Sequence, residues 1–131
     1  MDFSNNILKF QKLDCQVMGL VRDSPMVVQD WLVEPSMGKG GKNAAAFPCI
    51  SCPGIDEEDG GMVQAFGIPL LQGSPIPTII ICDKEKKVRY FATFSETTAR
   101  SVKETLRVVA AIKMVDEANG FALAPADWIS P

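Results

Sequence analysis

Cysteines are the residues of this 131-residue chain whose type and spacing could support redox chemistry, and two of them form a CxxC motif at Cys49 and Cys52. A CxxC motif between a strand and a helix can hold a redox disulfide, because the helix dipole lowers the pKa of a thiol. Pro53 and the acidic run at residues 56–59 oppose a thiolate here. We therefore expect Cys49 and Cys52 to be packing thiols with ordinary or raised pKa values, and a redox pair is the alternative.

The other two cysteines, Cys15 and Cys82, lie in apolar strand candidates, and we expect them to act as small hydrophobic residues. A zinc site would need them, or carboxylates, beside Cys49 and Cys52, because the chain has no histidine. The lack of histidine also removes the commonest general base of enzymes. We expect neither a metal nor a cofactor.

The composition is that of one ordinary globular domain, with 47% hydrophobic and 22% charged residues. The net charge of -3 gives no basic field, so we expect no nucleic-acid partner. We also expect no membrane span and no signal peptide, because no suitable apolar run occurs. Free cysteines suggest a reducing compartment. We expect an intracellular protein, in the cytoplasm or, as an open alternative, in an organelle.

Apolar spacing in the first half of the chain predicts two helices with a strand between them. Residues 3–12 repeat apolar side chains at helical spacing, and residues 15–21 form a run typical of a buried strand. Ser24 and Pro25 suit the N-cap and first turn of the next helix. The buried stripe of that helix is predicted to consist of Val27, Val28, Trp31 and Leu32, with Trp31 as a packing residue.

The middle of the chain predicts a loop, a short strand and a weak helix. Glycine and proline mark residues 34–46 as the loop, and residues 47–51 suit the strand. The acidic residues 56–59 are typical of a helix start, where the dipole favours negative charge. Gly67 suits the end of that helix.

The second half predicts a hairpin followed by a long helix. Residues 78–82 are β-branched without alternation and therefore suit a central strand, and residues 83–86 suit a lysine-rich, solvated turn. The longest helix is predicted over residues 100–118. The second strand of the hairpin places Val88, Tyr90, Ala92 and Phe94 on one face and Arg89 on the other. The order of elements is an α/β layout.

Five stretches, in order along the chain, resemble typical two-cysteine peroxiredoxins. Residues 100–107 are similar to the family's G-R-S-V-x-E-T-L-R helix, with Ala99 in place of the glycine, and residues 78–84 resemble its F-I-I-D-K strand and turn. The other three are the strand region at residues 10–19, a D-S-x-x-x-x-x-x-W spacing at residues 23–31 and residues 125–128, which resemble the last four positions of the family's C-P-A-x-W tail. The resemblance implies one truncated domain over residues 1–131, with a thioredoxin-like central sheet flanked by helices and missing the N-terminal strands.

Three departures from the family pattern concern its catalytic residues. The family's peroxidatic cysteine precedes the helix that begins here near Phe3, so it has no position in this sequence. Ala124 occupies the position of the resolving cysteine, and Pro77 occupies that of the arginine that stabilises the thiolate. Peroxide reduction needs a thiolate of low pKa beside such donors. We expect no thioredoxin-dependent peroxidase activity.

Three further residues are expected to be architectural. Pro77 resembles the proline of the thioredoxin I-P-T turn, which favours a cis peptide bond, and an ordinary proline before a strand is the alternative. Arg100 and Glu104 lie one helical turn apart and can form an ion pair. In the family the arginine that matches Arg100 belongs to a structural ion-pair network.

Unpaired strand edges predict a protein partner. In the family, a strand missing here lies between those matching residues 15–21 and 78–82, and bare edges invite a partner strand. The family also pairs subunits through the strand matching residues 88–94. We therefore expect either a subunit of a larger assembly or a homodimer through Val88, Tyr90, Ala92 and Phe94.

These observations favour a catalytically degenerate peroxiredoxin homologue that acts as a non-enzymatic binding or structural subunit. One alternative is a thiol–disulfide redox protein that uses Cys49 and Cys52. Another is a fragment or variant of a thioredoxin-dependent peroxidase.

Overall fold

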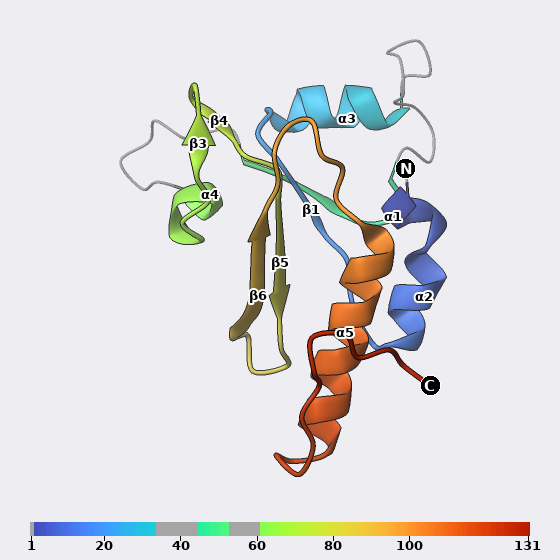
Figure 1. Cartoon of the computed structure of the whole chain (residues 1–131). Helices are drawn as coiled ribbons and strands as arrows, with labels where there is room; N and C mark the ends of the chain where they lie inside the picture. The colour runs from blue at the N-terminus through green and yellow to red at the C-terminus, as the bar shows by residue number, and fades with distance from the viewer. Residues whose placement is uncertain (1, 34–44, 53–60) are drawn as a thin grey trace. The chain divides into compact units, whose positions relative to one another are not determined.

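The computed structural model describes residues 2–33, 45–52 and 61–131 of an α/β chain (Figure 1). Most of the predicted loop at residues 34–46, Pro53 and the acidic run at residues 56–59 lie outside the described residues. The chain divides into two compact units, Met1–Leu8 with Gln16–Pro75 and Lys9–Cys15 with Ile76–Pro131. In the part of the chain that the structure describes, no helix has the length and apolar run that a bilayer span requires.

The predicted N-terminal helix is divided in two. α1 (Asp2–Asn5) ends in a turn in which the Asn6 N–H donates to the Phe3 carbonyl at 3.1 Å, and α2 (Ile7–Lys12) follows. Phe10 of α2 is almost fully buried. The sequence missed this division, because apolar spacing alone does not show a single turn residue.

A short parallel pair forms one of the small sheets of the first unit. β1 (Gly19–Val21) pairs with β2 (Cys49–Ser51), with Gly19 opposite Cys49 and Val21 opposite Ser51. The predicted strand at residues 15–21 is shorter than expected, because only three of its residues have a partner in β2.

α3 (Pro25–Val33) begins as the sequence predicts, with the Ser24 hydroxyl accepting a hydrogen bond from the Val27 N–H at 3.4 Å. Val28 is buried, and Trp31 and Leu32 are half-buried. The prediction of Val27 as part of the buried stripe is wrong, because its side chain is 51% exposed. Successive helical residues point about 100° apart, so a helix that is apolar on most sides buries only some of them.

α4 (Gly61–Ala65) ends at Gly67, as predicted. Gly67 has a φ of +67°, its N–H donates to the Gln64 carbonyl at 2.9 Å, and the Ile68 N–H donates to the Val63 carbonyl at 3.0 Å. These two bonds form a complete Schellman cap. A small antiparallel hairpin of β3 (Leu70–Leu71) and β4 (Ser74–Pro75) follows.

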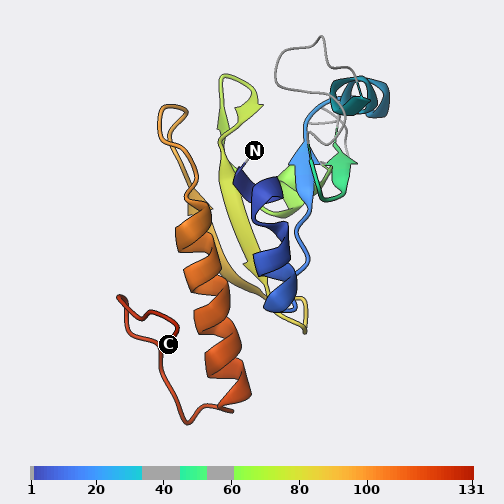
Figure 2. The same cartoon turned by 90° about the vertical axis from the view of Figure 1, so that its right-hand side faces the viewer.

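The second unit consists largely of a hairpin and the helix that lies along it (Figures 1 and 2). β5 (Thr78–Cys82) pairs antiparallel with β6 (Val88–Thr93), and α5 (Val102–Glu117) follows. The hairpin and the long helix are confirmed. Among the described residues β5 pairs with β6 alone, so it is an edge strand instead of a central one, and its isoleucines are half-buried.

α5 is fixed at its start by Ser101, whose hydroxyl accepts a hydrogen bond from the Glu104 N–H at 3.1 Å. The Thr105 hydroxyl donates to the Ser101 carbonyl at 2.7 Å, which allows Thr105 to be buried. The buried face consists of Val102, Thr105, Val108, Val109 and Ala111.

Candidate functional site

The CxxC motif lies on an extended segment instead of a helix start. Cys49 belongs to β2, and the Cys52 N–H donates to the Val21 carbonyl at 2.7 Å, which continues the parallel ladder one residue beyond β2. Side chains alternate between the two faces of a strand, so residues three apart point to opposite faces. Both thiols are free. A local disulfide would require the extended segment to change its conformation.

The Cys49 thiol packs against a glycine. A Cβ atom added to Gly19 would lie 3.2 Å from the Cys49 Sγ and 3.2 Å from the Phe47 ring, so both side chains would have to shift by a few tenths of an ångström. The Cys49 Sγ lies 3.9 Å from the Phe47 carbonyl oxygen, to which it donates. Burial raises the pKa of the Cys49 thiol. Its surroundings favour the protonated, packed form.

The remaining two cysteines differ in exposure. Cys15 is half-buried, and its pKa is raised by burial and by the charge of Asp14. The expectation that Cys82 acts as a small hydrophobic residue is wrong, because Cys82 is exposed at the end of β5. Across the described ranges, no three cysteine, aspartate or glutamate side chains cluster as a metal site requires.

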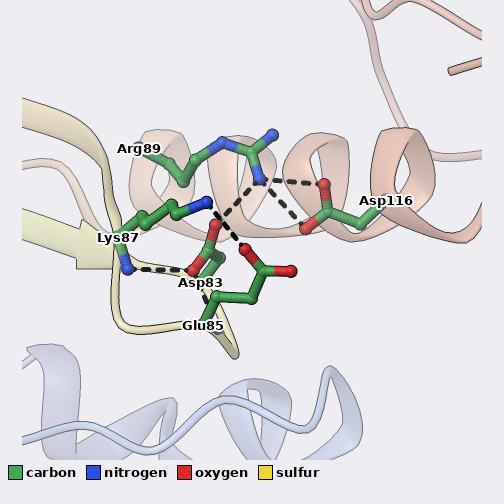
Figure 3. A network of polar contacts seen from close by, with 5 residues as sticks. All are labelled: Asp83, Glu85, Lys87, Arg89 and Asp116. Atoms are coloured by element: carbon green, nitrogen blue, oxygen red, sulfur yellow. Dashed lines mark hydrogen bonds and ion pairs between the residues drawn. The ribbon is translucent and has the colours of Figure 1, made fainter. Parts of the chain in front are cut away.

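The turn between β5 and β6 is organised by the Asp83 carboxylate (Figure 3). The carboxylate accepts hydrogen bonds from the Lys87 N–H at 3.0 Å and the Glu85 N–H at 2.9 Å. The pKa of Asp83 is lowered, first by the bond from Lys87 and then by Arg89 and Glu85, against an opposing effect of burial. The predicted solvated turn is confirmed by the strongly exposed side chains of Lys84 and Lys87.

Arg89 joins this turn to α5 (Figure 3). Its guanidinium lies 3.3 Å from the Asp83 carboxylate and 2.9 Å from that of Asp116. The hydrogen bonds to Asp116 and then to Asp83 raise the pKa of Arg89. Sequence reasoning missed this network, although an arginine in an apolar strand and an acidic residue late in the next helix are visible signals.

A β-bulge explains the orientation of Arg89. The strand register passes from Ile81 opposite Tyr90 to Cys82 opposite Val88, so Arg89 has no partner residue of its own. Such a bulge redirects a side chain that simple alternation would place on the other face. The predicted alternation of β6 is therefore interrupted at Arg89.

The prediction of a cis proline is wrong. The peptide bond before Pro77 is trans, and the Pro77 carbonyl accepts a hydrogen bond from the Phe94 N–H at 2.8 Å. A proline just before a strand has no ladder donor to lose and can still accept through its carbonyl. Pro77 is therefore an ordinary proline that directly precedes β5.

The expected pair of Arg100 and Glu104 is replaced by another. Glu104 accepts hydrogen bonds from two nitrogens of Arg107, at 2.7 and 2.8 Å. Ser101 caps α5, so Arg100 lies before the first helical turn and outside the ladder of neighbouring side chains. Arg107 also donates to the Trp128 carbonyl at 3.1 Å and so holds the C-terminal segment to the helix.

β6 and Phe94, which directly follows it, are the residues expected at a subunit interface. Val88 is exposed, whereas Tyr90, Ala92 and Phe94 are half-buried. The Phe94 N–H donates to Pro77 across the hairpin, and ladder hydrogen bonds alternate along an antiparallel pair. The N–H of Thr93 therefore points away from β5, toward the open edge of the strand.

Comparison with known proteins gives a consistent result. Residues 1–91 match the sequence profile of the AhpC/TSA family. Peroxiredoxin-4 of Dictyostelium discoideum is 30% identical over 128 residues, which cover 96% of this chain and 46% of the relative. Peroxiredoxin 2 of Drosophila melanogaster is 28% identical over 129 residues, which cover 96% of this chain and 61% of the relative. The chain thus spans about half the length of the curated relatives that it matches.

Solved structures agree with the fold. The reduced 2-Cys peroxiredoxin of Plasmodium vivax superposes with a TM-score of 0.80 at 20% identity, covering 97% of this chain and 62% of that structure. The mitochondrial 2-cys peroxiredoxin of Plasmodium falciparum gives a TM-score of 0.76 at 24% identity, covering 95% of this chain and 69% of that structure. Identities this low establish the thioredoxin-like fold alone.

Proposed function

The chain belongs to the AhpC/TSA family, and we propose that within this family it acts as a non-enzymatic binding or structural subunit of the peroxiredoxin type. The observation that carries the proposal is the environment of the thiols. The pKa of Cys49 is raised by burial, and so is that of Cys15. Peroxide reduction needs the opposite, a thiol whose pKa is lowered by nearby cations and N–H donors.

Two arginines of the hairpin and α5 are already engaged in ion pairs. Arg89 is paired with Asp83 and Asp116, and Arg107 is paired with Glu104. Positions that the resemblance assigns to the resolving cysteine and the thiolate-stabilising arginine hold Ala124 and Pro77. These residues support the non-enzymatic assignment.

A binding role is supported by the surfaces that the chain leaves uncovered. Among the described residues each strand has one partner strand, so every strand has an open edge. Apolar side chains are also exposed near the C-terminus, with Phe121 96% and Leu123 86% exposed. We propose that β6 forms a homodimer through Val88, Tyr90, Ala92 and Phe94, or that the chain is a subunit of a larger assembly. Its free thiols suit a reducing compartment inside the cell.

A redox pair of Cys49 and Cys52 is not supported, because the extended segment directs the two side chains to opposite faces.

Steady-state turnover of hydrogen peroxide by the purified chain, with thioredoxin, thioredoxin reductase and NADPH, tests the proposal. We expect no NADPH consumption above that of the coupling enzymes alone. Turnover that disappears in Cys49→Ser or Cys52→Ser but persists in Cys82→Ser would contradict the proposal. Cys82→Ser is the matched control, because it removes an exposed thiol outside the motif.

A further inference from the structure

The turn after α5 contains an Asn-Gly pair in an unusual backbone setting. Ala118 is the C-cap of α5, and the next two residues have positive φ angles, +49° for Asn119 and +84° for Gly120. Both residues are exposed. Asparagine and glycine tolerate this left-handed region better than other residues do.

The Phe121 N–H closes this turn by donating to the Ala118 carbonyl at 3.0 Å, whereas the helix end shows only one of the two bonds of a Schellman cap. The Asn119 N–H donates to the Asp116 carbonyl at 3.3 Å, as in a Schellman cap. The second bond of such a cap would join the Gly120 N–H to the Val115 carbonyl, and within residues 61–131 the structure shows no hydrogen bond from that N–H. The end of α4 is a built-in comparison, because both bonds form there.

We propose that Asn119 is a site of spontaneous deamidation, with the backbone nitrogen of Gly120 as the nucleophile. That nitrogen attacks the side-chain amide carbon of Asn119, a new C–N bond closes a five-membered succinimide, and the amide leaves with the transferred proton as ammonia. Water then adds to either carbonyl of the ring. The products are an aspartate or an isoaspartate at position 119, and no oxidation or reduction takes place.

Three observations favour reaction at this position. The nucleophilic N–H is not held by a backbone acceptor, glycine has no Cβ to shield its nitrogen, and a Cβ built on Gly120 meets no atom within 4 Å. Asn6, by contrast, precedes a β-branched residue, Ile7, whose side chain shields the backbone nitrogen that would have to attack. Asn6 therefore serves as an internal reference for a slow site.

Deamidation would change both the charge and the length of the backbone at this turn. A new carboxylate would join Asp116 and Glu117 at the negative end of the helix dipole, where the last turn of α5 has no basic residue. Isoaspartate would add a methylene group to the main chain. Either product would act on the segment from Asn119 to Trp128, which Arg107 holds to α5.

Incubation of the folded chain at mildly alkaline pH, followed by peptide mapping with mass spectrometry, tests the proposal. We expect the peptide containing Asn119 to gain the mass difference between an amide and an acid, and to split into aspartate and isoaspartate forms. Conversion should be at least about tenfold faster than at Asn6, which corresponds to a barrier lower by about 1.4 kcal/mol.

Two variants serve as controls. Asn119→Gln should abolish the change, because glutamine would close a less favourable six-membered ring, and Gly120→Ala should slow it by shielding the nitrogen. Conversion of Asn119 in the unaltered chain no faster than that of Asn6 would overturn the proposal. So would equal rates in the unaltered chain and in Gly120→Ala.

Discussion

A thiol's position on a strand decides what it can do in this chain. The CxxC spacing of Cys49 and Cys52 brings two thiols together on a helical turn, but on an extended segment it directs them to opposite faces. The pKa of Cys49 is raised because its thiol is partly buried. The motif alone therefore does not define a redox site.

Alkylation of the folded protein should follow exposure. We predict that Cys82 reacts first with iodoacetamide, because it is exposed, and that buried Cys52 reacts last. Modification of Cys49 should keep accelerating above the ordinary thiol pKa of about 8.5, since its pKa is raised. Peptide-resolved mass spectrometry measures all four rates. Rapid labelling of Cys49 near pH about 6 would contradict this prediction.

Substitution of Gly19 should disturb the packing around Cys49. The Cβ of Gly19→Ala would lie 3.2 Å from the Cys49 Sγ, so we expect the free energy of unfolding to fall by about 1–3 kcal/mol. Adding Cys49→Ala should restore part of the loss, with a coupling energy of about 0.5 kcal/mol or more. Urea denaturation of the two single variants and the double variant measures this coupling. Simple additivity would show that the two residues do not share the space.

Local sequence rules predicted some residues well and others badly. The cap at Ser24 and the stop at Gly67 follow from backbone chemistry within a few residues, and both are present. The pairing of Glu104 was predicted with the wrong arginine, because that choice depends on where the helix begins. A boundary that moves by one residue changes which side chains can meet.

The hairpin and α5 are held together by a residue that no periodic pattern indicates. Alternation places Arg89 on one face of β6, whereas the bulge redirects it toward Asp116. A bulge depends on the pairing of two strands, so it could not be predicted from either strand alone. The hairpin itself was predictable because a short polar turn at residues 83–86 separates its two apolar runs.

The stability that Asp83 contributes should depend on pH. Its pKa is lowered in the folded state, so its contribution is complete above the unfolded value of about 4 and is lost as the pH falls through the lower folded value. We therefore expect Asp83→Asn to lower the melting temperature at neutral pH and to differ little from the original chain in strong acid.

Thermal denaturation across the acidic pH range measures whether the melting temperatures of Asp83→Asn and the original chain approach each other. Asp30→Asn is the matched control, because Asp30 is an exposed carboxylate of α3 for which the described part of the chain shows no ion pair. A constant difference between Asp83→Asn and the original chain at every pH would show that the Asp83 charge is not responsible.

At the scale of the whole chain, five dispersed motifs predicted the thioredoxin-like fold, and solved peroxiredoxin structures support it. The position of β5 was predicted less well, since a run such as Ile79–Ile81 indicates apolar surroundings and does not specify which strand supplies them. Its isoleucines are only half-buried. The sequence therefore predicted that β5 pairs with β6, but it did not determine whether β5 has a second partner strand.

We predict that the purified chain is not a stable isolated monomer. If β6 pairs with a second copy, Thr93→Pro should weaken the dimer, because it removes an outward N–H while leaving the ladder to β5 intact. Thr93→Val keeps that N–H and is the matched control. Sedimentation velocity over a range of concentrations distinguishes the two variants. A monomeric original chain at micromolar concentration with a cooperative melt would refute the prediction.

The distribution of the two tryptophans makes the two compact units optically separable. Trp31 belongs to the unit that contains α3, and Trp128 belongs to the unit that contains α5. Single-tryptophan variants, Trp31→Phe and Trp128→Phe, would each leave one intrinsic fluorophore that reports on one unit. Coincident emission changes during denaturation would indicate a single cooperative transition, whereas separate midpoints would give each unit its own stability.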